Sequence, residues 1–191
     1  MSFTKGEKTV ITRREARKAQ RRAARLLRKA GVKLTGDEKK HIEIVEFGLG
    51  ELETTGYQQL MYANTERYCA KELVLFPGQT CPEHRHPPVG ADPGRRKTLR
   101  CRYGRVYLYV EGERTKKPKC KPNKDNARFF TVFCEIELKA GEQYSVPPDT
   151  KHWFQAGDKG AVISEFSSTS RDEADDYTDP RIDRMTKIIE D

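Results

Sequence analysis

The chain has 191 residues, of which 35% are hydrophobic and 35% charged, a length that suits one domain with a full core and an appended element. It contains no run of about eighteen apolar residues and no hydrophobic segment near its start, so we expect neither a membrane span nor a secretory signal. The five cysteines are odd in number and include no Cys-x-x-Cys pair, which favours reduced thiols over a disulfide framework or a zinc ribbon. These features together predict a cytoplasmic protein.

The net charge of +8 is concentrated near the N-terminus. Residues 1–40 contain fourteen Lys and Arg against four Asp and Glu, whereas the other 151 residues sum to about −2. An Arg-rich segment of this kind can attract nucleic acid or another anionic surface through its charge. No aromatic residues or base-reading motif accompany it, so we expect a solvated basic face without a nucleic-acid partner.

Helical signals account for this basic segment. Thr12-Arg-Arg-Glu15 has the pattern of a capping box, and Gly31 is a suitable residue just beyond a helix end. Between them, small and apolar residues recur at helical spacing: Ala16, Ala19, Ala23, Leu26, Leu27 and Ala30. We therefore expect a helix of about eighteen residues that packs loosely on the body or on a partner subunit. Thr35-Gly-Asp-Glu38 repeats the capping pattern and predicts a second short helix.

The rest of the chain reads as strands. β-branched and aromatic residues gather in short runs, separated by Gly, Pro and charged turns; the runs lie around Val74 and Phe76, at Cys101–Val110, Phe129–Leu138, Gln143–Val146 and Ala161–Phe166. Closely spaced short strands without alternating helices indicate an all-β barrel or sandwich. We expect three parts: a basic helical extension over 1–41, a barrel domain over 42–183 and a C-terminal tail over 184–191.

Two half-motifs about sixty residues apart carry histidines. The first is Gly78-x5-His84-x-His86, and the second is Gly141-x5-Pro147-x4-His152. Side chains alternate along a strand, so both histidines of a His-x-His point to one face. Three neutral imidazoles that converge inside a β-barrel form a site for a divalent transition metal, which usually takes a carboxylate as well.

These two motifs resemble the metal-binding motifs of the cupin superfamily, whose fold is a double-stranded jelly-roll barrel. More narrowly, residues 71–87, 102–113 and 148–157 resemble the cupin-type D-lyxose isomerases, as do residues 165–170 and 178–182. The resemblance covers residues 45 to 183. It implies an all-β, single-domain cupin with an N-terminal helical extension, and an aldose–ketose isomerase for D-lyxose or D-mannose.

The resemblance also implies the roles of individual residues. His84, His86 and His152 are expected to bind a divalent metal, with manganese first and zinc, iron, cobalt or nickel as alternatives. The metal would polarise O1 and O2 of the sugar, and Glu165 would move the proton between C2 and C1 through a cis-enediol. Lys71 would donate a hydrogen bond or a proton. We expect the protein to be a homodimer that binds a monosaccharide. We do not expect it to associate with a membrane.

Several of these residues also have purely structural explanations. Glu165 alternates with Ile163, so it faces the same interior, where it could be paired with a lysine. Lys71 could instead extend to solvent. Asp179 and Arg181 are more typical of a structural salt bridge than of substrate contacts. Trp153 could pack in the core or against the sugar.

One position departs from the cupin pattern. A glutamate ligand precedes a glycine by seven positions in that pattern, and counting back from Gly104 gives Lys97. Either Lys97 swings outward, so that water or a loop carboxylate such as Asp92 completes the site, or its ammonium occupies the place of the metal. Glu83 cannot replace the ligand, because it alternates with His84 and faces away.

Lys97 therefore leaves three functions open. The first is the metal-dependent aldose–ketose isomerase. The second is a three-histidine iron dioxygenase, which needs no neighbouring glutamate base. The third is a non-catalytic sugar-binding cupin that has lost its metal.

Overall fold

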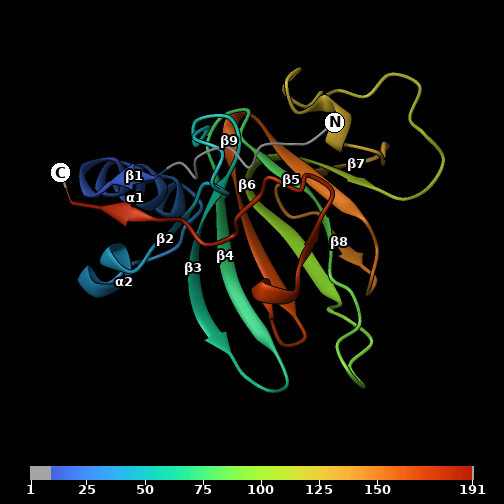
Figure 1. Cartoon of the computed structure of the whole chain (residues 1–191). Coiled ribbons are helices and arrows are strands. Elements are labelled where there is room, and N and C mark those ends of the chain that lie inside the picture. Colours follow the sequence, from blue (N-terminus) through green and yellow to red (C-terminus); the bar gives the residue numbers. More distant parts are fainter. Residues whose placement is uncertain (1–9, 191) are drawn as a thin grey trace.

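Antiparallel strands dominate residues 10–190, the part of the chain that a computed structural model describes (Figure 1). Within these residues one large sheet contains nine strands: β2 (Glu43–Val45), β3 (Tyr57–Asn64), β4 (Cys69–Leu75), β5 (Thr80–Arg85), β6 (Lys97–Val110), β7 (Cys134–Lys139), β8 (Gln143–Val146), β9 (His152–Ser167) and β10 (Asp176–Tyr177). The sheet curls into a half-barrel, which confirms the predicted all-β cupin fold with an N-terminal helix.

Strand β9 is the central strand of this half-barrel and pairs with three other strands. Its first half pairs with β5, its second half pairs with β4, and β6 runs beside nearly its whole length. The order β10-β5-β9-β4-β3-β2 follows on one side, while β7 and β8 pair with β6. A functional side chain at either end of β9 is therefore held between two neighbouring strands.

Every second side chain along each strand points to the inner face of the sheet. Ile163 and Ala161 on β9, Leu73 and Leu75 on β4, and Leu99 and Cys101 on β6 all belong to the interior core. Glu165, Lys71 and Lys97 continue these same three rows, so alternation alone directs their side chains into the barrel. The sheet bends where β6 passes β9: Gly104 has φ +75°, and a Cβ there would lie 1.9 Å from the carbonyl oxygen of Gly160.

Helix α1 (Arg13–Lys29) begins and ends as the sequence predicts. Thr12 and Glu15 form the capping box, in which Thr12 N donates to Glu15 Oε2 at 2.8 Å and Glu15 N donates to Thr12 Oγ1 at 3.2 Å. A second capping box, formed by Thr35 and Glu38, begins α2 (Gly36–Lys40). Strands β1 (Ile11–Thr12) and β11 (Ile188–Ile189) form a separate parallel pair beside α1.

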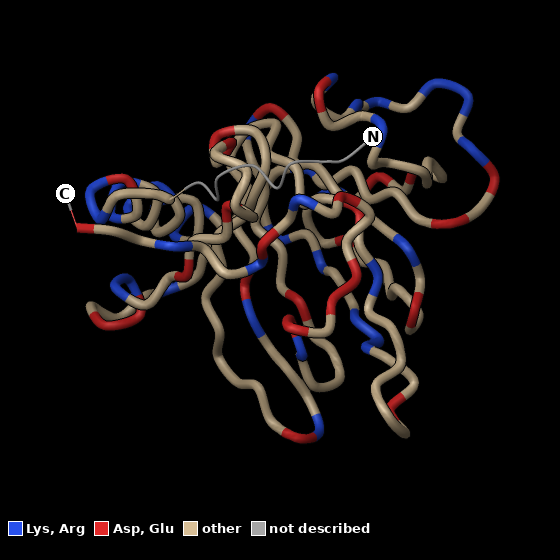
Figure 2. Tube along the Cα trace, viewed as in Figure 1, with Lys and Arg blue, Asp and Glu red and all other residues tan. Residues whose placement is uncertain are grey.

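The apolar stripe of α1 packs on the outer face of the sheet. The buried helix residues Ala16, Ala19, Ala23, Ala24 and Leu27 share a second core with Val74, Phe76 and Val162. The predicted loose packing is therefore wrong: Ala23 and Leu27 are fully buried, because the small side chains of this stripe allow a close approach to the sheet. The Lys and Arg residues of α1 lie on its other faces and appear as blue segments along this helix in Figure 2. No helix in residues 10–190 is both long and apolar enough to cross a membrane.

One predicted strand is partly wrong. The run Phe129–Leu138 forms a strand only from Cys134, because Phe129 ends the short helix η1 (Ala127–Phe129) and the next residues form a loop. The carboxylate of Glu83 accepts hydrogen bonds from the backbone N–H groups of Thr131 and Val132 at 2.5 and 3.0 Å. These donors are therefore unavailable for a strand ladder. All five cysteines are free thiols, as predicted.

Candidate functional site

Three histidines meet inside the half-barrel. His84 on β5 and His152 at the start of β9 are cross-strand partners, and His86 follows β5 by one residue. A bulge in β5 between Cys81 and His84 allows both of these residues to face inward while Glu83 faces out. The ligand atoms of the three imidazoles all lie within 4.8 Å of one another, and all three side chains are buried.

Backbone carbonyls fix the tautomers of two of these rings. His84 Nδ1–H donates to Pro82 O and His152 Nδ1–H donates to Thr150 O, each at 2.8 Å. Each ring therefore presents the lone pair of Nε2 to the cluster. Burial, followed by the charge of Lys97, lowers the pKa of both histidines well below the ordinary value, so both are neutral. His152 Nε2 is buried and has no hydrogen-bond partner among the described residues. Neutral imidazoles with an unused, inward lone pair fit a divalent metal.

His86 is held differently. Its Nδ1 lies 2.5 Å from Asp175 Oδ1, and Arg95 Nη2 lies 2.9 and 3.0 Å from the two ring nitrogens. Burial raises the pKa of Asp175 to about 7, although the charge of Arg95 opposes the rise. Sequence reasoning missed both partners, because Arg95 lies in the long loop before β6 and Asp175 in an acidic loop with no periodic pattern.

Glu165 lies between two lysines. It pairs across the sheet with Lys71, whose Nζ is 3.5 Å from Oε1, while Lys97 Nζ is 3.7 Å from Oε2. All three side chains are 3% exposed or less. Burial raises the pKa of Glu165, but the charges of Lys71, Lys97 and Arg95 outweigh it and lower the pKa to about 2. The site therefore holds an ionised carboxylate between two ammonium groups.

The side chains of Lys97 and Lys71 are both buried inside the half-barrel. Lys97 does not swing outward, because strand alternation places its buried ammonium inside the barrel, and Lys71 does not reach solvent. Asp92 pairs with Arg171 and takes no part in the histidine cluster. Glu83 faces away, as predicted. Among the described residues the cluster thus consists of imidazoles alone, without a carboxylate.

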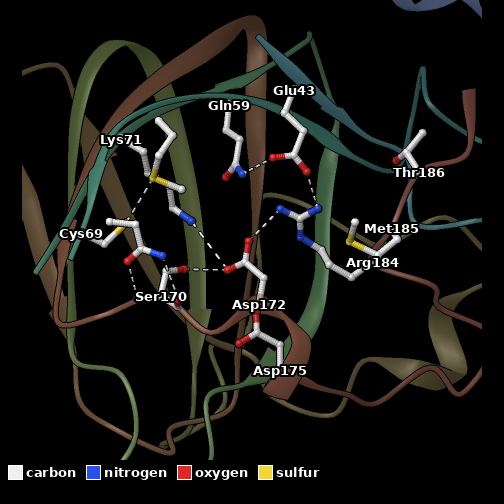
Figure 3. A network of polar contacts seen from close by, with 12 residues as sticks. Glu43, Gln59, Cys69, Lys71, Ser170, Asp172, Asp175, Arg184, Met185 and Thr186 are labelled. Atoms are coloured by element: carbon white, nitrogen blue, oxygen red, sulfur yellow. Dashed lines mark hydrogen bonds and ion pairs between the residues drawn. The ribbon is translucent and has the colours of Figure 1, made fainter. Parts of the chain in front are cut away.

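A network of buried charges connects this site to the C-terminal segment (Figure 3). Asp172, in the short helix η2 (Asp172–Ala174), accepts hydrogen bonds from Arg95 Nη1 at 3.1 Å, Arg184 Nη2 at 2.8 Å and Ser170 Oγ at 2.6 Å. Its Oδ1 is also 3.9 Å from Lys71 Nζ. Burial raises the pKa of Asp172, but Lys71, Arg184 and Arg95 outweigh it and lower the pKa. Asp172 therefore helps to fix Lys71 and Arg95 in place.

Little free space remains beside these groups. A cavity of about 20 Å³ lies against His86, Arg95, Asp175 and Thr169, far smaller than the roughly 300 Å³ or more of a typical small-molecule site. This cavity would have to widen, by movement of lining groups such as Arg95 and Asp175, before it could hold a sugar.

The other residues singled out by sequence have structural roles. Trp153 is fully buried on the outer face of β9, stacks on Tyr109 at 3.9 Å between ring centroids and donates to Val132 O. Trp153 is therefore core packing and does not face the histidines. Arg181 forms the expected salt bridge with Asp179 at 2.6 Å.

A curled antiparallel β-sheet with three histidines that face its interior defines a cupin-type fold with a candidate metal centre. The L-ribose isomerase of Cellulomonas parahominis has the same fold, with a TM-score of 0.76 at 15% identity over 96% of this chain and 100% of that one. The L-ribose isomerase of Geodermatophilus obscurus aligns with a TM-score of 0.70 over 96% of this chain and 100% of that chain, at 14% identity.

Sequence comparison gives the family itself. The D-lyxose isomerase family profile matches residues 37–191. The chain is 57% identical to the D-lyxose/D-mannose isomerase of Thermosediminibacter oceani, over 94% of this chain and 99% of that protein. It is 56% identical to the D-lyxose ketol-isomerase of Cohnella laeviribosi, over 91% and 96%. The chain belongs to the D-lyxose isomerase family and is an aldose–ketose isomerase, as the sequence predicted.

Proposed function

We propose that the protein interconverts D-lyxose, or its homologue D-mannose, with the corresponding ketose through a cis-enediol, with a divalent metal at the three histidines. The observation that carries this proposal is the buried carboxylate of Glu165, whose Oε1 makes no hydrogen bond among the described residues. It shares the barrel interior with the histidine cluster. The names of the two relatives described above support the choice of sugar.

Moving the carbonyl from C1 to C2 requires one proton to change carbon. In the forward direction the carboxylate of Glu165 takes the proton from C2, the electrons of that C–H bond form the C1–C2 double bond, and the π electrons of the C1 carbonyl move to O1, which takes a proton from the Lys71 ammonium. In the second half the O2–H proton passes to the Lys71 amine, the C2 carbonyl forms, and the electrons of the C1–C2 double bond take a proton from Glu165, either the one it removed or one exchanged with solvent, to form the new C1–H bond. Proton donation and removal by positioned groups of this kind contribute about 10²- to 10⁴-fold to such rates.

Lys71 would contact the sugar oxygens during these steps. Its ammonium lies 3.5 Å from the same carboxylate oxygen that has no hydrogen bond. While the ammonium faces Glu165 it keeps that carboxylate ionised but weakly basic, because its charge lowers the pKa. A sugar oxygen that takes over the contact of Lys71 would raise the basicity of Glu165 when substrate is bound.

His84, His86 and His152 would hold the metal, which when bound supplies a Lewis acid for the sugar oxygens that carry negative charge in the enediolate. The orphaned Nε2 of His152 and the carbonyl-fixed tautomers support this assignment. Manganese as the metal and a homodimer as the assembly remain predictions from the family resemblance, and a cytoplasmic location remains a prediction from the composition of the sequence.

The test is a sugar panel with purified protein supplied with Mn²⁺. We expect D-lyxose and D-mannose to yield ketose, and Glu165→Gln to lower kcat by at least about a hundredfold. The matched control is Glu66→Gln, an exposed carboxylate in the β3–β4 turn, which should leave turnover unchanged. Sugar binding without ketose formation at any metal concentration would refute the proposal and favour the non-catalytic alternative.

A further inference from the structure

Two buried cations face the histidine cluster, and the proposed reaction does not require either of them. Lys97 is the first residue of β6, and its side chain is 3% exposed. It precedes Leu99 and Cys101 on the inward row of that strand, so the backbone itself directs the ammonium into the barrel. The strand is paired on both sides at this point, with Ser167 of β9 and Val146 of β8. Lys97 therefore has no route to solvent by a simple rotation of its side chain.

Arg95 is the second cation. Its guanidinium is 6% exposed and is anchored by Asp172 at 3.1 Å and Asp175 at 3.3 Å. From there Nη2 lies 2.9 Å from Nδ1 and 3.0 Å from Nε2 of His86. A guanidinium has donors only, so at Nε2 it uses the same lone pair that a metal needs. For His86 to become a ligand through Nε2, Arg95 must first withdraw.

The carboxylates that pair with these two cations are not among the candidate metal ligands of the cluster. Among the described residues the candidate metal ligands are three neutral imidazoles. Glu165 is shared between Lys71 and Lys97, and Asp175 contacts Nδ1 of His86. The Lys97 ammonium lies 5.8 Å from the centre of the Phe154 ring, and Phe154 is two residues after His152 on the same inward row of β9. A dication that enters this cluster gains neutral donors only and meets repulsion from two fixed positive charges in a poorly screened interior.

We propose that Lys97 and Arg95 make the three-histidine cluster of this chain a weak, exchangeable metal site, in which the Lys97 ammonium stays beside the metal as a resident cation. This inference rests on the proposed function, because it takes the three imidazoles as the metal ligands. The metal would then act as an activator, and the occupancy of its site would follow the concentration of the free metal ion. The enzyme would leave purification largely metal-free and require excess divalent metal for turnover.

Manganese binding tests the inference without any activity measurement. Metal-free wild type, Lys97→Gln, Lys97→Glu and Arg95→Gln are titrated with Mn²⁺, and the free ion is followed by electron paramagnetic resonance. Lys97→Gln removes the charge while Lys71 still pairs with Glu165, and Lys97→Glu also adds a carboxylate. The matched control is Lys39→Gln, an exposed lysine of α2 that changes the net charge equally.

We expect the wild type to bind weakly and Lys97→Gln to lower the Kd by at least about tenfold, since one unit charge near a dication is removed. Lys97→Glu should lower it further, Arg95→Gln should also tighten binding, and Lys39→Gln should match the wild type. A wild type that keeps one tightly held Mn²⁺ per chain through dialysis overturns the inference. So do folded Lys97→Gln and Arg95→Gln variants that bind no tighter than wild type.

One further variant separates this inference from the proposed function. His152→Ala removes the imidazole whose Nε2 is unpartnered among the described residues, and it should abolish the Mn²⁺ binding that the other variants strengthen. If His152→Ala binds Mn²⁺ as the wild type does, the histidines are not the metal ligands and the proposed metal centre fails. If a Lys97 variant does not fold, as judged by circular dichroism, the wild-type Kd and Arg95→Gln decide the outcome.

Discussion

Replacing Glu165 by Gln should reveal how strongly the two lysines hold this carboxylate. The pKa of Glu165 is lowered from its ordinary value of 4.5 to about 2 in the folded chain, since Lys71, Lys97 and Arg95 outweigh the cost of burial. A folded-state pKa that is lowered by this amount corresponds to about 3 kcal/mol of stability. That stability is fully present above pH 4.5 and is lost as the pH falls from 4.5 towards 2. Glutamine has the same shape but no charge, so at neutral pH the variant should be less stable by about that amount.

Urea unfolding at several pH values measures this difference. At pH 7 the free energy of unfolding of Glu165→Gln should lie about 3 kcal/mol below that of the wild type, and the gap should narrow as the pH falls below 4.5. The control Glu66→Gln, which removes an exposed carboxylate, should follow the wild type throughout. A gap that is absent at pH 7, or one that stays constant down to pH 3, would show that Glu165 is not held by the lysines as described.

Four further predictions concern the metal, the second catalytic candidate, the helix and the bend of the sheet. Treatment with a chelator should abolish ketose formation and added Mn²⁺ should restore it; activity that survives exhaustive chelation would exclude the metal. Lys71→Gln should lower kcat by at least about a hundredfold with little change in KM, measured by initial rates on D-lyxose, because its ammonium lies beside Glu165. Thr12→Ala removes the capping box of α1 and should cost about 1 kcal/mol in urea unfolding, whereas Thr12→Ser should cost less. Gly104→Ala places a Cβ against Gly160 O at positive φ, so the free energy of unfolding should fall by at least about 2 kcal/mol; an unchanged value would contradict the close approach of β6 and β9 at this bend.

The sequence predicted the parts of the site that follow from local periodicity. Glu165 alternates with Ile163, and the His-x-His at the end of β5 matched, together with His152 of β9, a motif of known spacing. Their common position in the barrel interior could therefore be inferred from the sequence alone. The capping box of α1 is equally local, because Thr12 and Glu15 are only three residues apart.

Other parts of the site depend on contacts between distant segments. The pairing of Lys71 with Glu165 spans two strands whose register no local pattern fixes. Arg95 and Asp172 come from loops, and their positions result from charges that neutralise one another only in the folded barrel. The strand predicted from Phe129 failed for a similar reason, since the distant Glu83 takes the backbone donors of Thr131 and Val132.

Solvent deuterium exchange tests the central claim, proton transfer by Glu165 in an aldose–ketose isomerase, most directly. The protein is supplied with Mn²⁺ and D-lyxose in D₂O, and the sugars are analysed by NMR over many turnovers. We predict ketose with deuterium at C1 and recovered D-lyxose with deuterium at C2, both absent with Glu165→Gln. Ketose that forms at the wild-type rate with Glu165→Gln, or deuterium at these carbons that Glu165→Gln still introduces, would contradict it.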